Sequence, residues 1–193
     1  ISVNRWTLVS KMKIQYQSES LIILESALFR TTTTLIIGAD YILLVDPNWL
    51  PIEIDFISAH VNEYGEGKAK FLLFTHSDYD HTIASANFVA NPKVESILKE
   101  IATFDDEYYI QRSYTIEYPH IDLVIEGEGI SQHIGSDHYR FYQARVHNAD
   151  GLITVNESKG IVIAGDYLSN VEFPYLYDSL AEYEKTLGAF AAI

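Results

Sequence analysis

The sequence predicts a mixed α/β fold in which two groups of strands are separated by helical segments. Short apolar runs rich in β-branched residues, bounded by polar turns, occur before residue 46 and again after residue 122. Apolar residues at helical spacing lie between the two groups and again near the end of the chain. No segment rich in Pro, Gly or Ser separates these parts, so we expect a single domain over residues 1–193.

The first group of strands is predicted at residues 21–24, 33–39 and 41–45. The four threonines at 31–34 support the second of these, because β-branched side chains favour strands. Pro51 opens a predicted helix over residues 51–64, since proline is favoured at the first helical position. Four successive apolar residues at 71–74 then indicate a buried strand.

Further helices and strands are expected in the second half of the chain. A short helix is expected at residues 82–89, and one or two helices are expected within residues 92–118. The second group of strands is predicted at residues 123–126, 132–134, 139–146, 152–155 and 161–164. A last helix is expected at residues 179–191.

Residues of the metal-ligand type follow directly after the predicted strand at 71–74. His76, Asp78, Asp80 and His81 lie within six positions. In an extended segment, residues i and i+2 project to the same side, so His76 and Asp78 can face one ion while Asp80 and His81, past a bend, face another. Imidazole and carboxylate are ligands for Zn²⁺, Mn²⁺ and Fe²⁺. The alternative is a solvated acidic loop with two unrelated histidines.

Two later strands are followed by the same kinds of residue. The strand predicted up to residue 146 ends at His147, and the one over 161–164 ends at Gly165 and Asp166. Taken singly, His147 is explained as a turn residue and Asp166 as a helix cap. Three such strand ends in one chain favour a shared metal site.

These motifs resemble those of the metallo-β-lactamase superfamily. The family's H-x-H-x-D-H motif corresponds to residues 76–81, its third histidine to His147, and its Gly-Asp pair to Gly165 and Asp166. Leu43-Leu-Val-Asp-Pro47 is similar to the family's strand that ends in a supporting aspartate, here Asp46. The resemblance covers roughly residues 31–183 and implies a four-layer αββα sandwich with the metals at one edge of the two sheets.

The resemblance implies two divalent metal ions, with two departures from the family pattern. The first ion would be bound by His76, Asp78 and His147, and the second by Asp80, His81 and Asp166. Asp78 stands where most of the family has histidine; a harder oxygen ligand tilts the site from Zn²⁺ toward Mn²⁺ or Fe²⁺. The family's last histidine follows the helix after the Gly-Asp strand. The sequence stops at Ile193, so either that segment lies beyond it or the second site is defective.

Composition narrows the classes of function. The chain has 27 acidic and 13 basic residues and a net charge of −14, which argues against nucleic acids and anionic membranes as partners. Cysteine is absent, so disulfides and thiolate zinc sites are excluded. No apolar run of membrane-spanning length and no signal peptide is visible, so we expect a cytoplasmic protein; whether a signal was removed before Ile1 is left open.

The favoured function is metal-dependent hydrolysis of a small-molecule ester, thioester, lactone or phosphoester by hydroxide that the metals generate from water. The resemblance implies that Asp80 also orients this water and passes a proton to the leaving group. Motifs of serine hydrolases, P-loop proteins and dinucleotide-binding proteins are absent. Two alternatives stay open: a dinuclear iron oxidoreductase related to flavo-diiron proteins, which carry glutamate at the position of Asp78, and a degenerate, non-catalytic binding module.

Overall fold

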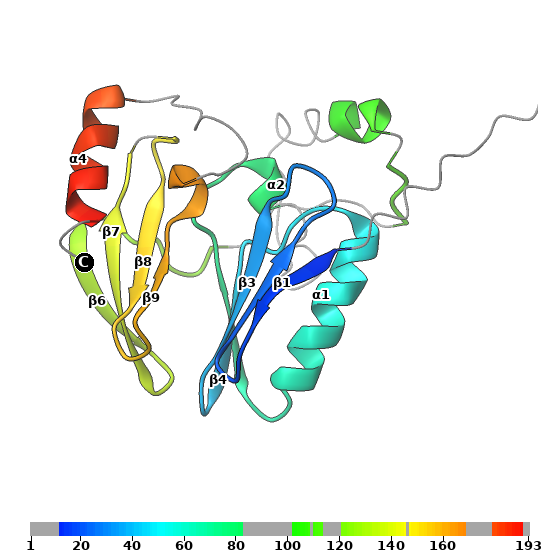
Figure 1. The fold of residues 1–193 in the computed structure, drawn as a ribbon, viewed down its shortest axis with the longest axis horizontal. Helices are drawn as coiled ribbons and strands as arrows, with labels where there is room; N and C mark the ends of the chain where they lie inside the picture. The colour runs from blue at the N-terminus through cyan, green and yellow to red at the C-terminus, as the bar shows by residue number, and fades with distance from the viewer. Residues whose placement is uncertain are drawn as a thin grey trace, which may run out of the picture.

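Two β-sheets lie face to face between two helices, which gives four layers in the order helix, sheet, sheet, helix (Figure 1). The computed structural model describes residues 12–82, 102–108, 110–113, 121–145, 147–168 and 179–190. The predicted αββα sandwich is therefore confirmed. No helix in these segments is long and apolar enough to cross a membrane.

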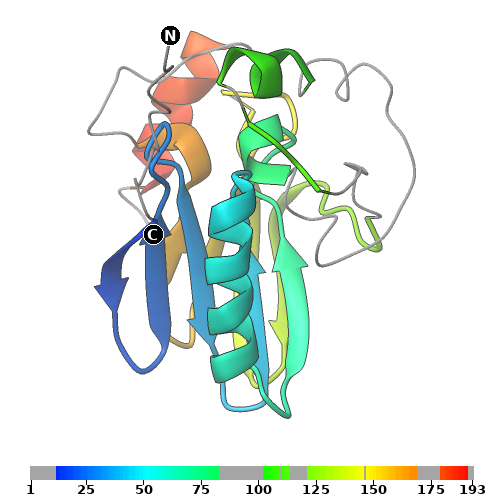
Figure 2. The ribbon, with the colours of Figure 1, turned by 90° about the vertical axis from the view of Figure 1, so that its right-hand side faces the viewer.

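The first sheet contains five strands in the order β1-β2-β3-β4-β5. Their bounds are Lys13–Gln17, Leu21–Glu25, Thr32–Ile37, Tyr41–Val45 and Ala69–Leu73. Neighbouring strands are antiparallel except β4 and β5, which are parallel. A parallel pair needs a crossover connection, and helix α1 (Pro51–Tyr64) supplies it while covering the outer face of the sheet (Figure 2).

The second sheet is a four-stranded antiparallel meander in the order β6-β7-β8-β9. Its strands are Glu128–Ile134, Asp137–Gln143, Leu152–Asn156 and Ile161–Ile163. Helix α4 (Leu180–Phe190) contributes Tyr183 and Phe190 to the apolar cluster on the outer face of this sheet.

The side-chain alternation of β4 places the core. Ile42 and Leu44 pack toward α1, whereas Tyr41, Leu43 and Val45 pack against the second sheet. All five residues of β4 are buried, as expected for a strand covered on both faces. This strand therefore forms the centre of the sandwich.

Several expected elements differ from the observed ones. Residues 123–126 form no strand, because they pair with no strand of the described residues. Leu123 and Val124 are both 66% exposed, so their apolar side chains do not mark a buried strand here. Strand β1 was not expected from its polar, exposed sequence. Strand β5 is an edge strand with Phe71 42% exposed, so the expectation of a buried strand was wrong. The segment 82–89, which was expected to be a helix, lies almost wholly outside the described residues. Within 92–118, residues 102–107 are helical.

Candidate metal centre

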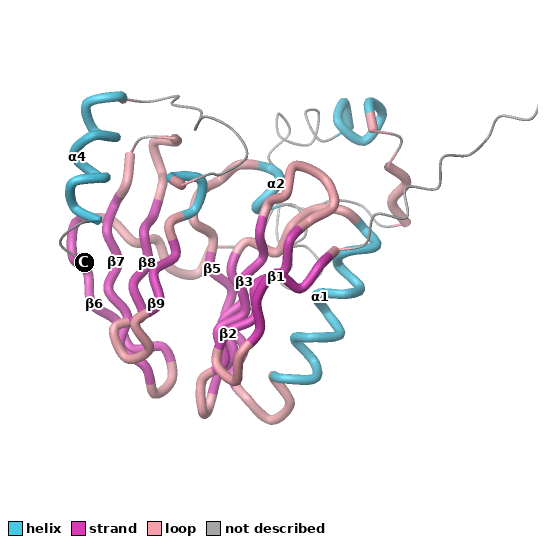
Figure 3. The backbone as a smooth tube through the Cα atoms, viewed as in Figure 1, coloured by secondary structure: helices cyan, strands magenta, loops and turns pink. Residues whose placement is uncertain are grey.

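The segments that carry the predicted ligands meet at one end of the two sheets. They are the loop after β5 with the short helix α2 (Tyr79–Thr82), the loop between β7 and β8, and the 3₁₀ turn η2 (Gly165–Tyr167) after β9 (Figure 3). The amide of Leu152 donates a hydrogen bond to the carbonyl of Thr75 at 2.7 Å, which ties the second sheet to the loop after β5. Strands β7 and β9 end before the predicted residues 146 and 164, so His147 and Asp166 lie in the following loop and turn.

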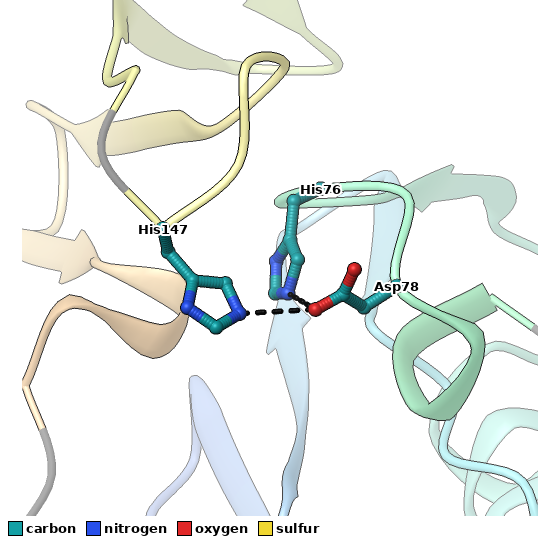
Figure 4. A group of neighbouring side chains, drawn as sticks. All are labelled: His76, Asp78 and His147. Atoms are coloured by element: carbon teal, nitrogen blue, oxygen red, sulfur yellow. Dashed lines mark hydrogen bonds and ion pairs between the residues drawn. The ribbon is translucent and has the colours of Figure 1, made fainter. Parts of the chain in front are cut away.

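The first group of ligands consists of His76, Asp78 and His147 (Figure 4). Oδ2 of Asp78 lies 3.0 Å from Nε2 of His147 and 3.4 Å from Nε2 of His76. Both histidines are buried, and the side chain of Asp78 is 34% exposed. One carboxylate oxygen and two imidazole nitrogens thus lie close together, where a single ion could contact all three.

The second group lies beside the first and consists of His76, His81 and Asp166. Nε2 of His81 is 3.3 Å from Oδ1 of Asp166, while Oδ2 of Asp166 is 3.8 Å from Nε2 of His147. The carboxylate of Asp166 therefore has one oxygen toward each group. Such an arrangement can bridge two cations.

Asp80 lies next to the second group rather than within it. Its Oδ2 is 3.8 Å from Nε2 of His81 and accepts a hydrogen bond from the hydroxyl of Thr31 at 3.3 Å. Thr31 lies in the hairpin loop between β2 and β3, so this contact joins the hairpin to the metal loop. Asp80 is held close to His81 but has the loosest contact of the predicted ligands.

Asp46 supports the site through contacts with Thr75 and His81. Its Oδ1 accepts the amide of Thr75 at 2.9 Å, and its Oδ2 accepts the hydroxyl of Thr75 at 2.6 Å and lies 3.0 Å from Nδ1 of His81. The Thr75 hydroxyl is also 2.9 Å from Nδ1 of His76. Because that hydroxyl donates its hydrogen to Asp46, it can accept one from Nδ1 of His76, which leaves Nε2 of this ring available as a ligand.

Close packing at Thr75 explains the glycine in the Gly-Asp pair. Gly165 has φ of 54°, a conformation that other residues adopt only with strain, and a Cβ on it would lie 2.9 Å from Oγ1 of Thr75. Glycine therefore lets η2 approach the metal loop closely enough to bring Asp166 beside His81.

Nearby imidazoles favour the ionised form of two of the carboxylates. Burial alone would raise the pKa of Asp78, but the hydrogen bond with His147 and the nearby imidazole of His76 outweigh burial and hold this pKa well below its ordinary value. Burial likewise opposes ionisation of Asp166, but the neighbouring imidazole of His81 lowers the pKa of Asp166 below its ordinary value.

Negative charge is in excess at the centre. Burial alone would lower the pKa of His81, but the charge of Asp46 and the nearby carboxylate of Asp166 raise it well above its ordinary value. Burial raises the pKa of Asp80, and the charges of Asp166 and Asp78 add to this effect. Within the described residues no lysine or arginine forms an ion pair with the four aspartates of the site. The site is therefore built to attract a cation.

The donor set fits a divalent transition metal. Nε2 of His76 and Nε2 of His81 are buried without a hydrogen-bond partner among the described residues. A buried polar atom that lacks a partner is costly, and metal coordination is one way to satisfy it. The unpartnered nitrogens face carboxylate oxygens of Asp78 and Asp166, and imidazole with carboxylate is a set that Zn²⁺, Mn²⁺ and Fe²⁺ accept.

Two contributors were not identified in the sequence. Thr75 contacts Asp46 and His76, and Asn148 donates to Oδ1 of Asp78 at 2.5 Å. Each is adjacent in sequence to a predicted ligand, which is the only signal that could have drawn attention to it. The remaining described histidines have other surroundings: Nδ1 of His60 is 2.8 Å from the carbonyl oxygen of Phe56, and His133 and His138 pack together on the β6–β7 hairpin.

The sequence model of the metallo-beta-lactamase superfamily matches residues 27–192. The chain therefore belongs to this superfamily, as its motifs predicted. No curated protein sequence matches it.

Solved structures show the same fold at low sequence identity. A metallo-beta-lactamase from Pontibacter korlensis is 13% identical, with a TM-score of 0.63 over 94% of this chain and 86% of its own. A metallo-beta-lactamase family protein from Thermus thermophilus is 18% identical, with a TM-score of 0.64 over 90% and 70%. Metallo-beta-lactamase IND-7 is 14% identical, with a TM-score of 0.62 over 95% and 86%. At such identities the likeness supports the fold alone.

Proposed function

We propose that this chain is a metal-dependent hydrolase that cleaves a small-molecule ester, thioester, lactone or phosphoester. The observation that carries the proposal is the pair of adjacent ligand groups that share His76 and contain buried, unpartnered imidazole nitrogens. Membership of the superfamily supports metal-dependent hydrolysis as the general class. The acidic composition is consistent with a small-molecule substrate rather than a nucleic acid.

In this proposal His76, Asp78 and His147 hold one ion, and Asp80, His81 and Asp166 hold the other. Divalent cations bound there would lower the pKa of water so that hydroxide is available near neutral pH. Asp166 directs one oxygen toward each group and so fixes the distance between them. Asp46 and Thr75 hold the rings of His81 and His76 in place.

Asp80 is proposed to act in proton transfer as well as in binding. Thr31 holds Oδ2 of Asp80 from the side of the β2–β3 hairpin, which leaves Oδ1 as the oxygen that can accept a proton from water. From there the proton can pass to the leaving group. The chain needs no side-chain nucleophile for this reaction.

The donor atoms suit more than one divalent ion. Imidazole nitrogens suit Zn²⁺, whereas the carboxylate at Asp78 gives the first group a harder oxygen donor that suits Mn²⁺ or Fe²⁺. We propose that these three ions compete for the site. The same carboxylate is the reason to test iron-dependent redox chemistry as a second candidate.

The test is reconstitution of metal-free protein with Zn²⁺, Mn²⁺ or Fe²⁺, followed by elemental analysis and a panel of esters, thioesters, lactones and phosphoesters. We expect one to two ions per chain and metal-dependent turnover on at least one class. Metal binding without hydrolysis, but with consumption of oxygen or nitric oxide by the iron form, would replace the hydrolase by an oxidoreductase. Failure to bind any of the three ions would overturn the proposal in favour of a non-catalytic binding module.

A further inference from the structure

The two oxygens of Asp78 have different partners. Oδ2 faces His147 and His76 at 3.0 and 3.4 Å, whereas Oδ1 accepts a hydrogen bond from Nδ2 of Asn148 at 2.5 Å. The amide nitrogen rather than the amide oxygen must face Asp78, because two oxygens at this distance would repel each other. Asn148 is thus the partner of the carboxylate oxygen that points away from the histidines.

From this division of contacts we propose that Asn148 is a positioning residue that makes Asp78 a monodentate metal ligand through Oδ2. The inference rests on the proposed metal centre and adds a residue to it. Aspartate is shorter than histidine and offers two equivalent donor atoms where imidazole offers one. The amide on Oδ1 removes this equivalence, so the carboxylate presents a single donor, as an imidazole would.

The coordination chemistry explains why a single donor matters. A carboxylate that chelates through both oxygens occupies two coordination positions, whereas catalytic sites of this type keep a position open for water or substrate. With Oδ2 alone, His76, Asp78 and His147 supply three donors and leave a position free. A partner on the second carboxylate oxygen also fixes the orientation of the ligand, and loss of such partners commonly weakens metal affinity about 10–100-fold.

The surrounding loop holds Asn148 in register with its neighbour His147. The amide of Ala144 donates to the carbonyl of Gly151 at 2.7 Å, and a Cβ on Gly151 would lie 2.2 Å from the carbonyl oxygen of Ala144. The same loop therefore delivers a ligand, His147, and the group that orients another ligand, Asp78, from the opposite segment of the site.

The experiment is a double-mutant cycle read out as Zn²⁺ affinity, by competition with a chromophoric chelator. Asn148→Ala should weaken binding of the ion at His76, Asp78 and His147 about 10–100-fold when Asp78 is present. In an Asp78→His background the carboxylate is gone, so Asn148→Ala should cost less than about threefold. Asp150→Ala, which removes an exposed side chain from the same loop, is the matched control and should leave affinity unchanged.

Each result decides the matter. Equal losses in both backgrounds would show that Asn148 acts by shaping the loop, and no loss in either would show that it orients nothing; both overturn this inference while the metal centre stands. A wild-type protein that binds no metal would overturn the proposed function itself.

If circular dichroism shows that Asp78→His does not fold, Asp78→Ala serves as the background, because it also lacks the carboxylate. The Co²⁺-substituted protein gives a second readout: Asn148→Ala should alter its visible spectrum only when Asp78 is present.

Discussion

The two ends of the sandwich each contain a buried polar cluster, and the clusters differ in how completely they are satisfied. They lie at opposite ends of β7: Asp137 begins this strand, and the loop that carries His147 follows it. At the Asp137 end, one carboxylate oxygen receives donors from Tyr41 at 2.6 Å, Asn156 at 3.0 Å and Lys159 at 2.5 Å. Every charge there has a partner within the protein.

The other end has the opposite balance. Four aspartates face three imidazoles, and no lysine or arginine of the described segments pairs with them. Three imidazole nitrogens, Nε2 of His76 and both ring nitrogens of His81, have no hydrogen-bond partner among the described residues. Both clusters bridge the two sheets, so burial and polarity alone do not separate them. Counting donors against acceptors therefore distinguishes a structural clamp from a site that needs a cation.

The largest effect is expected from Asp166→Ala. The bridging carboxylate would be lost, so hydrolysis should fall by more than the roughly 100-fold typical of losing an outer partner. Asp166 lies in the turn that follows β9, so the free energy of unfolding should change little. Rates would be measured on whichever substrate the wild type turns over, with excess metal added back and with Asp150→Ala as the control. Wild-type activity in the variant would reduce Asp166 to a turn residue.

Asp46→Asn tests the support behind the histidines. Asp46 has φ of 47°, which asparagine tolerates well, so the substitution changes charge without adding backbone strain. Loss of the carboxylate should weaken binding of the ion at His81 by about 10–100-fold. Calorimetric titration of metal-free protein measures it. Unchanged affinity for both ions would remove Asp46 from the metal centre.

Asp137→Asn tests the cluster around Asp137, in which every charge has a partner. Removing its charge leaves Lys159 and Tyr41 without their ionised partner and should cost about 2 kcal/mol in the free energy of unfolding at pH 7. Metal affinity should not change, because the cluster lies at the far end of β7. Denaturant unfolding and chelator competition on one preparation measure both. An equal effect on metal affinity would break the distinction between the two ends.

The same variant has a defined pH dependence. Burial alone would raise the pKa of Asp137, but hydrogen bonds from Lys159, Tyr41 and Asn156 lower it below its ordinary value. Stability from this group is therefore fully present above the unfolded-state pKa of about 4 and is lost as pH falls through the folded-state pKa. The difference between wild type and Asp137→Asn should shrink below pH 4, and a constant difference would contradict the assigned partners.

Local patterns predicted much of the fold and the identity of the ligand candidates. The helix expected at 51–64 and the strand expected at 41–45 have the observed bounds, because Pro51 and an unbroken apolar run specify them within a few residues. Strand β1 has no such signal: its polar residues form an exposed edge that depends on pairing with β2.

The contacts that orient the ligand residues could not be predicted from local sequence patterns. The contact between Asp46 and Thr75 spans 29 residues, and the one between Asp78 and Asn148 spans 70. Such pairs are brought together by the packing of the two sheets, and threonine or asparagine at a strand end is equally typical of an ordinary turn. The sequence motif predicted residues of ligand type, but only the fold shows which partner orients each of them.

The smallest expected effect is a change of metal preference in Asp78→His. Imidazole would replace a hard oxygen donor and restore the commoner ligand set of the family, so the ratio of bound Zn²⁺ to Mn²⁺ or Fe²⁺ should rise by about tenfold, the effect of a difference near 1.4 kcal/mol. Histidine is larger than aspartate, but the side chain of Asp78 is 34% exposed and has room toward solvent. Competition with equal concentrations of the ions, followed by elemental analysis, measures the ratio. Asp137→Asn is the matched control, since it removes a carboxylate from the cluster at the other end of β7. It should leave the ratio of bound Zn²⁺ to Mn²⁺ or Fe²⁺ as in wild type. An unchanged ratio in Asp78→His would mean that Asp78 does not bind metal, and the first ligand group would then have only its two histidines.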